Sequence, residues 1–200
     1  MYARVTTFHL QPGTADEFKQ YGQDVVLPRI KQVPGFQRAI VLQNDAAGKA
    51  IVITLLETED QRDALETTGF FHEYHAATEH LFTAPPVTEQ YELVSQNTHG
   101  EQLPIHALFA FIRVHPGMMD EALDFSHNAR SQATTQAPGF VDAWILANLQ
   151  KNKLIPLYFW ETETARPEPE TSDDLKKTVA QSSHMHAPLT MEVATVTIQS

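Results

Sequence analysis

The sequence repeats itself at a constant offset, because residues 12–94 return without a gap at residues 116–198. Pro12-Gly13 returns as Pro116-Gly117, which sets the offset at 104 residues (116 − 12 = 104). Pro34-Gly35-Phe36 returns as Pro138-Gly139-Phe140 at the same offset. A self-similar sequence of this kind indicates that one structural unit occurs twice. We therefore predict a tandem duplication, with a first unit at residues 1–96, a linker at residues 97–104 and a second unit at residues 105–200.

The pattern within the first copy predicts four strands and two helical segments. The strands are expected over residues 2–10, 36–42, 50–56 and 87–94, where β-branched and aromatic residues alternate and turn residues follow. Thr14 and Glu17 have the spacing of a capping box, which predicts that a helix begins there, and Pro28 is expected to interrupt it. A second helical segment is expected over residues 60–82, with a break near Gly69. The order β-α-β-β-α-β is that of a ferredoxin-like unit of the α+β class.

The second copy has the same order, with strands expected over residues 107–114, 141–149, 154–160 and 191–198 and its second helix over residues 173–185. Both faces of the first strand of each copy are largely apolar. A sheet covered by helices on one side needs only one apolar face, so the other face must also be buried. We predict that the antiparallel sheets of the two copies pack together as an α+β barrel within one chain. The alternative is that each copy covers its second face with another chain.

Composition excludes several classes of function. The net charge is −11 at pH 7, which disfavours binding to nucleic acids and to acidic membrane surfaces. The chain contains no cysteine, which excludes disulfides, thiolate nucleophiles and cysteine-ligated metals. The first residues lack the apolar core of a signal peptide, and no apolar stretch reaches the length of a membrane span. A cytoplasmic protein is expected.

The motifs resemble those of the antibiotic biosynthesis monooxygenase family, within the dimeric α+β barrel superfamily. The resemblance rests on the strand that ends in Pro-Gly, the acidic pair that opens the first helix, the Pro-Gly-Phe that enters the second strand, the glutamate that closes the third strand and the histidine-bearing second helix. In the first copy these are Pro12-Gly13, Asp16-Glu17, Pro34-Gly35-Phe36, Leu56-Glu57 and His75. Members are usually single units that dimerise. The duplication would supply the two units of such a dimer in one chain. A homodimer of the fused chain is a further possibility.

The resemblance implies oxidative chemistry on a small aromatic molecule. Members that oxidise polyketide quinols need no metal or flavin, so no bound cofactor is expected. They position a phenolic substrate with polar and aromatic side chains, for which Tyr74 and His75 are the matching candidates. An imidazole titrates near neutral pH, so His75 is the candidate general base for a phenolic proton, with Tyr74 assisting.

Haem-degrading members imply a different use of the same fold. Their asparagine, tryptophan and histidine correspond to Thr6, Leu65 and His75 in the first copy, so only the histidine is kept. In the second copy these positions hold Ala110, Pro169 and Val179. Haem binding through His75 is therefore the third hypothesis, after oxidation of a phenol and after a non-catalytic barrel that binds a small molecule or serves in assembly.

The second helical segments of the copies differ, which places the site in the first copy. Around Pro167-Glu168-Pro169 the second copy is polar and broken by proline, whereas residues 70–75 are aromatic and contain two histidines. We predict a site between the helices and sheet of the first copy. Besides His75 and Tyr74, its expected lining is Thr6, Phe8, Tyr21, Leu55 and Phe71.

Two other clusters have a chemical and a structural interpretation. His72 and His75 could share a metal ion if Glu73, Glu79 or His80 supplied a third ligand, and His184-Met185-His186 is a second partial ligand set. We expect no metal at either. Trp144, Trp160, Tyr158 and Phe159 could form the aromatic wall of a ligand pocket, but we expect them in an ordinary core.

Overall fold

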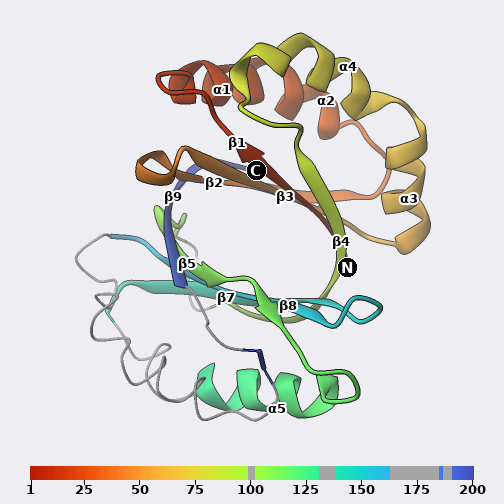
Figure 1. Ribbon diagram of the computed structural model, residues 1–200, viewed down its shortest axis with the longest axis vertical. Coiled ribbons are helices and arrows are strands. Elements are labelled where there is room, and N and C mark those ends of the chain that lie inside the picture. Colours follow the sequence, from red (N-terminus) through yellow and green to blue (C-terminus); the bar gives the residue numbers. More distant parts are fainter. Residues whose placement is uncertain (99–101, 131–137, 163–184, 187–190) are drawn as a thin grey trace. The chain divides into compact units, whose positions relative to one another are not determined.

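The computed structural model describes residues 1–98, 102–130, 138–162, 185–186 and 191–200 (Figure 1). The chain divides into two compact units. The first unit comprises Met1–Glu92 with Thr195–Ser200, and the second unit comprises Leu93–Ala194. The predicted packing of the two sheets stays a prediction, as does the linker at residues 97–104, part of which lies outside the described residues.

The sheet of the first unit is antiparallel and has the ferredoxin-like strand arrangement. Its strands are β1 (Tyr2–His9), β2 (Phe36–Asn44), β3 (Lys49–Leu56) and the first part of β4 (Val87–Thr98). β1 lies between β3 and β4, and β3 lies between β1 and β2. The end of β9 (Met191–Gln199) pairs with the free edge of β2, with Ile40 opposite Gln199 and Gln43 opposite Thr195. The chain therefore completes this unit with residues far along the sequence.

Helices cover one face of this sheet (Figure 1). They are α1 (Ala15–Tyr21), α2 (Leu27–Ile30), α3 (Glu59–Thr67) and α4 (Phe70–Thr78), with short 3-10 turns η2 (Asp45–Ala47) and η3 (Glu79–Leu81). The break near Gly69 separates α3 from α4, and Gly69 has a φ of 71°, which an L side chain rarely adopts. The interruption expected at Pro28 takes the form of a π-helical turn, η1 (Gly22–Val26), just before α2. Proline has no backbone N–H to continue the α-helical pattern.

The capping box predicted at Thr14 is wrong. Thr14 precedes α1, but its hydroxyl donates to the carbonyl oxygens of Gln11 at 2.9 Å and Leu81 at 3.2 Å, so it does not cap the helix. Glu17 instead lies 3.0 Å from the ring of His80. A reciprocal capping box does occur at the start of α3, between Thr58 and Gln61.

The elements of the second unit repeat those of the first at the offset of the sequence repeat. They are β5 (His106–Ala110), β6 (Ile112–Arg113), α5 (Met119–Arg130), β7 (Phe140–Asn148) and β8 (Lys153–Trp160). The bounds of β2 and β3 plus 104 give those of β7 and β8 (36 + 104 = 140; 56 + 104 = 160). The irregular register between Phe36 and Arg38 recurs between Phe140 and Asp142. The first strand is divided at Phe111, and the helix predicted over residues 173–185 falls almost entirely outside the described residues.

The large aromatic residues of the second unit belong to its core. Trp144 is 1% exposed and Trp160 is 0% exposed. Tyr158 and Phe159, which precede Trp160 in the sequence, are also buried. The indole N–H of Trp144 donates to Asp142 Oδ2 at 2.8 Å, and the side-chain amide of Gln96 donates to the same oxygen at 3.1 Å. Hydrogen bonds of this kind allow a carboxylate to be buried. No helix in the described part of the chain is long and apolar enough to cross a membrane.

Candidate functional site

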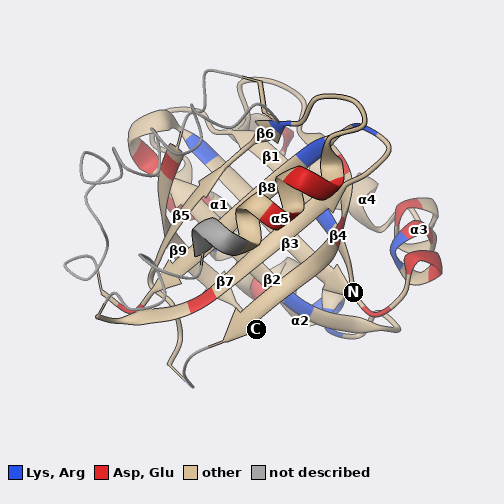
Figure 2. Cartoon of the chain, turned by 90° about the horizontal axis from the view of Figure 1, so that it is seen from below, with Lys and Arg blue, Asp and Glu red and all other residues tan. Residues whose placement is uncertain are grey.

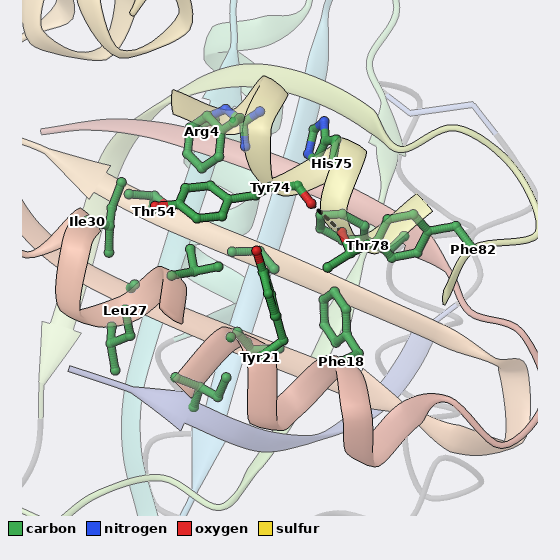
Figure 3. Close-up of a pocket in the computed structure, with 18 residues that line it drawn as sticks. Arg4, Phe18, Tyr21, Leu27, Ile30, Thr54, Tyr74, His75, Thr78 and Phe82 are labelled. Atoms are coloured by element: carbon green, nitrogen blue, oxygen red, sulfur yellow. Dashed lines mark hydrogen bonds between the residues drawn. The ribbon is translucent and has the colours of Figure 1, made fainter. Parts of the chain in front are cut away.

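The first unit contains a cavity between its sheet and its helices (Figure 3). The cavity offers about 80 Å³ to the centres of water-sized molecules and is partly open to solvent. Strands β1, β2, β3 and β9 supply one wall, and the segments α1, η1, α2 and α4 supply the other. The lining residues are Arg4, Phe8, Phe18, Tyr21, Gly22, Val26, Leu27, Ile30, Ala39, Val41, Val52, Thr54, Phe71, Tyr74, His75, Thr78, Phe82 and Ile198.

Aromatic rings form much of this lining. The ring of Phe8 lies 5.1 Å from the rings of both Phe18 and Phe82, measured between centroids. On the other side the rings of Tyr21 and Tyr74 lie 6.3 Å apart. Aromatic walls favour flat ligands, because such rings pack edge to face or offset against another ring.

The close approach of η1 to β9 depends on Gly22. A Cβ atom at this position would lie 2.9 Å from Cδ1 of Ile198, which is closer than carbon atoms normally pack. Gly22 and Ile198 both line the cavity. The glycine therefore lets the helix rest on the end of the strand, and the two together close this part of the cavity.

Five of the residues predicted for the site line the cavity, namely Phe8, Tyr21, Phe71, Tyr74 and His75. Thr6 is fully buried on the same face of β1, but it does not line the cavity, and its hydroxyl accepts a hydrogen bond from the guanidinium of Arg4. Leu55 does not line the cavity. Its neighbour Thr54 does, and because successive side chains of a strand point to opposite faces, Leu55 is buried on the other side of the sheet.

Arg4 is the charged residue among the cavity-lining residues that the sequence prediction omitted. Its side chain is 4% exposed, and its Nε donates to Glu66 Oε1 at 2.5 Å. Its terminal nitrogens donate to the hydroxyl oxygens of Thr6 at 2.5 Å and Thr88 at 3.1 Å, and its guanidinium carbon lies 3.6 Å from the centre of the Phe71 ring. Burial lowers the pKa of Arg4, while the nearby Glu66 carboxylate opposes that shift. The only signal in the sequence was alternation: an arginine on the same strand face as Phe8.

His75 is half-buried among aromatic rings. Its imidazole meets Phe8 edge to face at 5.9 Å and stacks on Phe71 at 6.3 Å between ring centres. Its pKa is lowered below the usual 6.5, chiefly by burial and then by the positive charge of Arg4. The imidazole is therefore neutral at pH 7 and can accept a proton. His75 and Phe82 also line a shallow hollow at the surface, which includes Pro85 and Pro86, so they lie between this hollow and the cavity.

The Tyr74 hydroxyl is buried without a hydrogen-bond partner. Tyr74 is 5% exposed, and its phenolic oxygen makes no hydrogen bond within 3.5 Å, although the Arg29 guanidinium lies 5.3 Å from the ring centre and opposes the rise in the pKa of the phenol. Burial raises the pKa of this phenol, which keeps it protonated at neutral pH. A buried hydroxyl without a partner is costly, and here it belongs to a residue that lines a cavity. A polar group of a bound molecule would satisfy it.

Replacing Tyr74 by phenylalanine is expected to raise the free energy of unfolding by about 1 kcal/mol, because the substitution removes an unsatisfied hydroxyl and keeps the ring. Tyr91→Phe is the matched control. Tyr91 is 2% exposed and donates to Glu89 at 3.1 Å, so its loss should lower the free energy of unfolding by about 1 kcal/mol. Urea denaturation of both variants measures the difference. Equal destabilisation by the two substitutions would contradict the description of Tyr74.

At the described positions equivalent to Arg4 and Thr6, the second unit has apolar residues. At the offset of 104, Arg4 corresponds to Leu108 and Thr6 to Ala110, both of which are buried. Thr54 corresponds to Tyr158, whose ring lies 6.3 Å from that of Trp160. His75 corresponds to Val179, which lies outside the described residues. The arginine, hydroxyl and imidazole groups at the cavity of the first unit are therefore supplied by residues specific to that copy.

The histidine clusters do not form a metal centre within the described ranges. In those parts of the chain, no three or more His, Asp or Glu side chains are arranged to hold a metal ion. His72 and His75 occupy one helix, and His186 lies beside His115 with ring centres 3.8 Å apart, while His184 falls outside the described residues.

No protein-family model matches the sequence, and no curated protein is significantly similar to it. Solved structures do match. An anthrone oxidase-like protein has a TM-score of 0.67 at 15% identity, covering 100% of this chain and 92% of that one. The chain has the fold of this anthrone oxidase-like protein, of two proteins described as candidate monooxygenases and of a heme-degrading enzyme. The resemblance inferred from the sequence motifs is thus confirmed at the level of the fold.

Two further proteins with this fold show how differently it is used. A candidate monooxygenase from Fusobacterium nucleatum subsp. nucleatum has a TM-score of 0.71 at 11% identity, covering 98% of this chain and 90% of that one. A heme-degrading enzyme from Listeria monocytogenes has a TM-score of 0.51 at 12% identity, covering 98% of this chain and 99% of that one. At such low sequence identity these matches establish a shared fold only, and the chemistry depends on the residues of the cavity.

Proposed function

We propose that the protein is a monooxygenase-like enzyme that binds a small, flat, largely apolar phenol or hydroquinone in the cavity of its first unit and oxidises it with dioxygen without a bound cofactor. One observation carries the proposal: a neutral imidazole and an unpartnered phenol line the same aromatic cavity. His75 supplies the imidazole and Tyr74 the phenol. The fold shared with monooxygenase-like proteins supports the same reaction class.

The proposed roles follow from the chemistry of the two groups. His75 accepts the phenolic proton of the substrate, because a neutral imidazole is a base near pH 7. Tyr74 donates a hydrogen bond to a second oxygen of the substrate. The resulting phenolate gives up electrons to dioxygen more readily than the phenol does. For a hydroquinone the net reaction balances as hydroquinone plus O₂ giving hydroxyquinone plus water, so one oxygen atom enters the ring and the substrate supplies all the electrons.

We also propose that the chain arose by tandem duplication. Equal element bounds at an offset of 104 residues, and a register irregularity that recurs at Phe36 and Phe140, support this origin. The polar site residues then mark divergence after the duplication, since the second unit holds Leu108 and Ala110 where the first has Arg4 and Thr6.

The test is oxygen uptake with a panel of hydroquinones, followed by mass spectrometry of the product after reaction under ¹⁸O₂. The proposal expects uptake at a rate above the uncatalysed reaction and one heavy oxygen atom in the product. Absence of uptake across the panel, together with tight binding of the same molecules, would favour the non-catalytic alternative. A Soret shift on titration with haem, lost in His75→Gln, would favour haem binding.

Filling the cavity is expected to weaken binding and to slow turnover. Thr54 is 2% exposed and lines the cavity, and its counterpart in the second unit is tyrosine. Thr54→Tyr should weaken binding of a hydroquinone by about tenfold or more, while the larger side chain lowers the stability by about 1–3 kcal/mol. Thr67→Tyr, on the exposed surface of α3, is the control and should leave binding unchanged. If Thr54→Tyr folds and binds normally, the ligand occupies another part of the protein.

A further inference from the structure

Arg4 carries the only formal charge among the described residues that line the cavity. Acidic side chains are common elsewhere in this chain, whose net charge is −11, and they follow helices such as α3 and α5 (Figure 2). The cavity instead combines apolar and aromatic side chains with one buried cation. A buried cation in such a place is a specific feature, because burial of a charge is costly unless the charge is paired, as that of Arg4 is with Glu66.

The guanidinium of Arg4 is held in position but not saturated. It has five N–H groups. Three of them donate to Glu66, Thr6 and Thr88, which leaves two for another acceptor. The Phe71 ring covers one face of the group, at 3.6 Å from the guanidinium carbon. The orientation is therefore fixed before a ligand arrives, which reduces the entropy lost on binding.

The two partners of this ion pair differ in their position, because Arg4 lines the cavity and Glu66 does not. The Glu66 side chain is 32% exposed, whereas that of Arg4 is 4% exposed. Water screens the carboxylate more strongly than it screens the guanidinium. Glu66 does not line the cavity, and His75, which does, is close to Arg4 and Phe71. A ligand in the cavity thus meets the cation and not the carboxylate.

We propose that Arg4 anchors an ionised oxygen of the ligand, so that the ligand class is an aromatic anion: a ring system that carries a phenolate or a carboxylate. The inference rests on the proposed function, because it places the ligand in the same cavity, and it deepens that function by naming the charge of the ligand. Arginine suits this role because its hydrogen bonds to an ionised oxygen are short and strong. The ring of the ligand would then pack on the aromatic walls next to Phe71.

Binding without turnover tests the inference on the full chain. 2-Naphthoate and 2-naphthamide form a matched pair of anion and neutral analogue, and neither is a hydroquinone. 2-Naphthol, titrated over a range of pH, tests the phenolate. We expect 2-naphthoate to bind about 10–100-fold more tightly than 2-naphthamide, the usual effect of a hydrogen bond to a charged group, or the affinity for 2-naphthol to rise by a similar factor as the naphthol ionises. The first result identifies a carboxylate and the second a phenolate.

Variants assign the preference to Arg4. Arg4→Gln should remove the preference for the anion, and Arg4→Lys, which keeps the charge, should retain part of it. Glu66→Gln, which keeps an acceptor oxygen for Nε of Arg4 and removes the competing carboxylate, should not weaken it. If Arg4→Gln fails to fold, the affinities of the unaltered protein and of Arg4→Lys for the naphthalene compounds still test whether the cavity prefers anions. Equal affinity for anion and neutral analogue, or a preference that survives Arg4→Gln, overturns the inference.

The outcome is separable from that of the proposed function. An Arg4-dependent preference for anions without any oxygen uptake leaves the inference standing and removes the monooxygenase. Oxygen uptake without a preference for anions does the reverse.

Discussion

His75→Gln is expected to slow oxygen uptake with a hydroquinone by about 10²–10⁴-fold, the usual contribution of a general base. Glutamine keeps a polar side chain of similar reach, but its amide does not accept a proton near neutral pH. The packing against Phe8 and Phe71 is partly lost as well, so binding should weaken modestly. Steady-state rates at saturating and at limiting substrate separate the two effects, because loss of the base lowers kcat.

The dependence of the rate on pH should carry the signature of His75. The imidazole acts as a base only when neutral, and its pKa is lowered by burial and by Arg4. The rate should therefore stay high as the pH falls through 6.5, the ordinary value for histidine, and decline only at lower pH. In His75→Gln this acidic decline should disappear.

His72→Gln is the matched control for the same substitution. His72 is exposed on the same helix and does not line the cavity. We expect its rate to lie within about twofold of the unaltered protein, since surface substitutions usually have small effects. Equal losses in the two variants would show that glutamine disturbs helix α4 and would remove the argument for a base at residue 75.

Glu66→Ala is expected to lower the free energy of unfolding by about 3 kcal/mol. The substitution leaves the guanidinium of Arg4 buried without its carboxylate, and breaking a buried ion pair by removing one partner typically costs about 3–5 kcal/mol. We expect the lower end of that range because the Glu66 side chain is 32% exposed. Urea denaturation measures the change, and Glu66→Gln, which keeps an acceptor oxygen, should recover part of it.

The pair formed by Arg29 and Glu73 provides the comparison. Its atoms lie 3.9 Å apart, and the side chains are 57% and 72% exposed. Glu73→Ala should therefore change the free energy of unfolding by less than about 1 kcal/mol. A loss for Glu66→Ala as small as that for Glu73→Ala would mean that water reaches Arg4, and the argument for an anion anchor would lose its physical basis.

The repeat made most of the elements predictable. The helices and strands end or break where turn residues predicted that they would, at Pro12-Gly13, Pro34-Gly35 and Gly69. The bounds of β7 and β8 follow from those of β2 and β3. Turn residues act locally, through their own backbone preferences, so the sequence carries their effect directly. Thr14 shows the limit of this reasoning, because its hydroxyl found the distant carbonyl of Leu81 instead of its own helix.

The site was harder to predict than the elements because strand faces are ambiguous when both are apolar. Thr54 and Leu55 are adjacent, and nothing in their neighbours tells which one points to the helices. Arg4 was omitted since its partners, Glu66 and Thr88, are distant in sequence. Ile198 reaches the cavity only because the end of β9 pairs with β2, a contact that no local pattern encodes.

That last pairing bears on how the protein is made. Ala39 bonds to Ser200 across 161 residues and Gln23 to Thr197 across 174. During synthesis the edge of β2 stays unpaired until these residues have been translated, so the first unit is completed only after the second has been made. One wall of the cavity thus depends on a contact between distant parts of the chain, and an edge of β2 left unpaired would be open to aggregation.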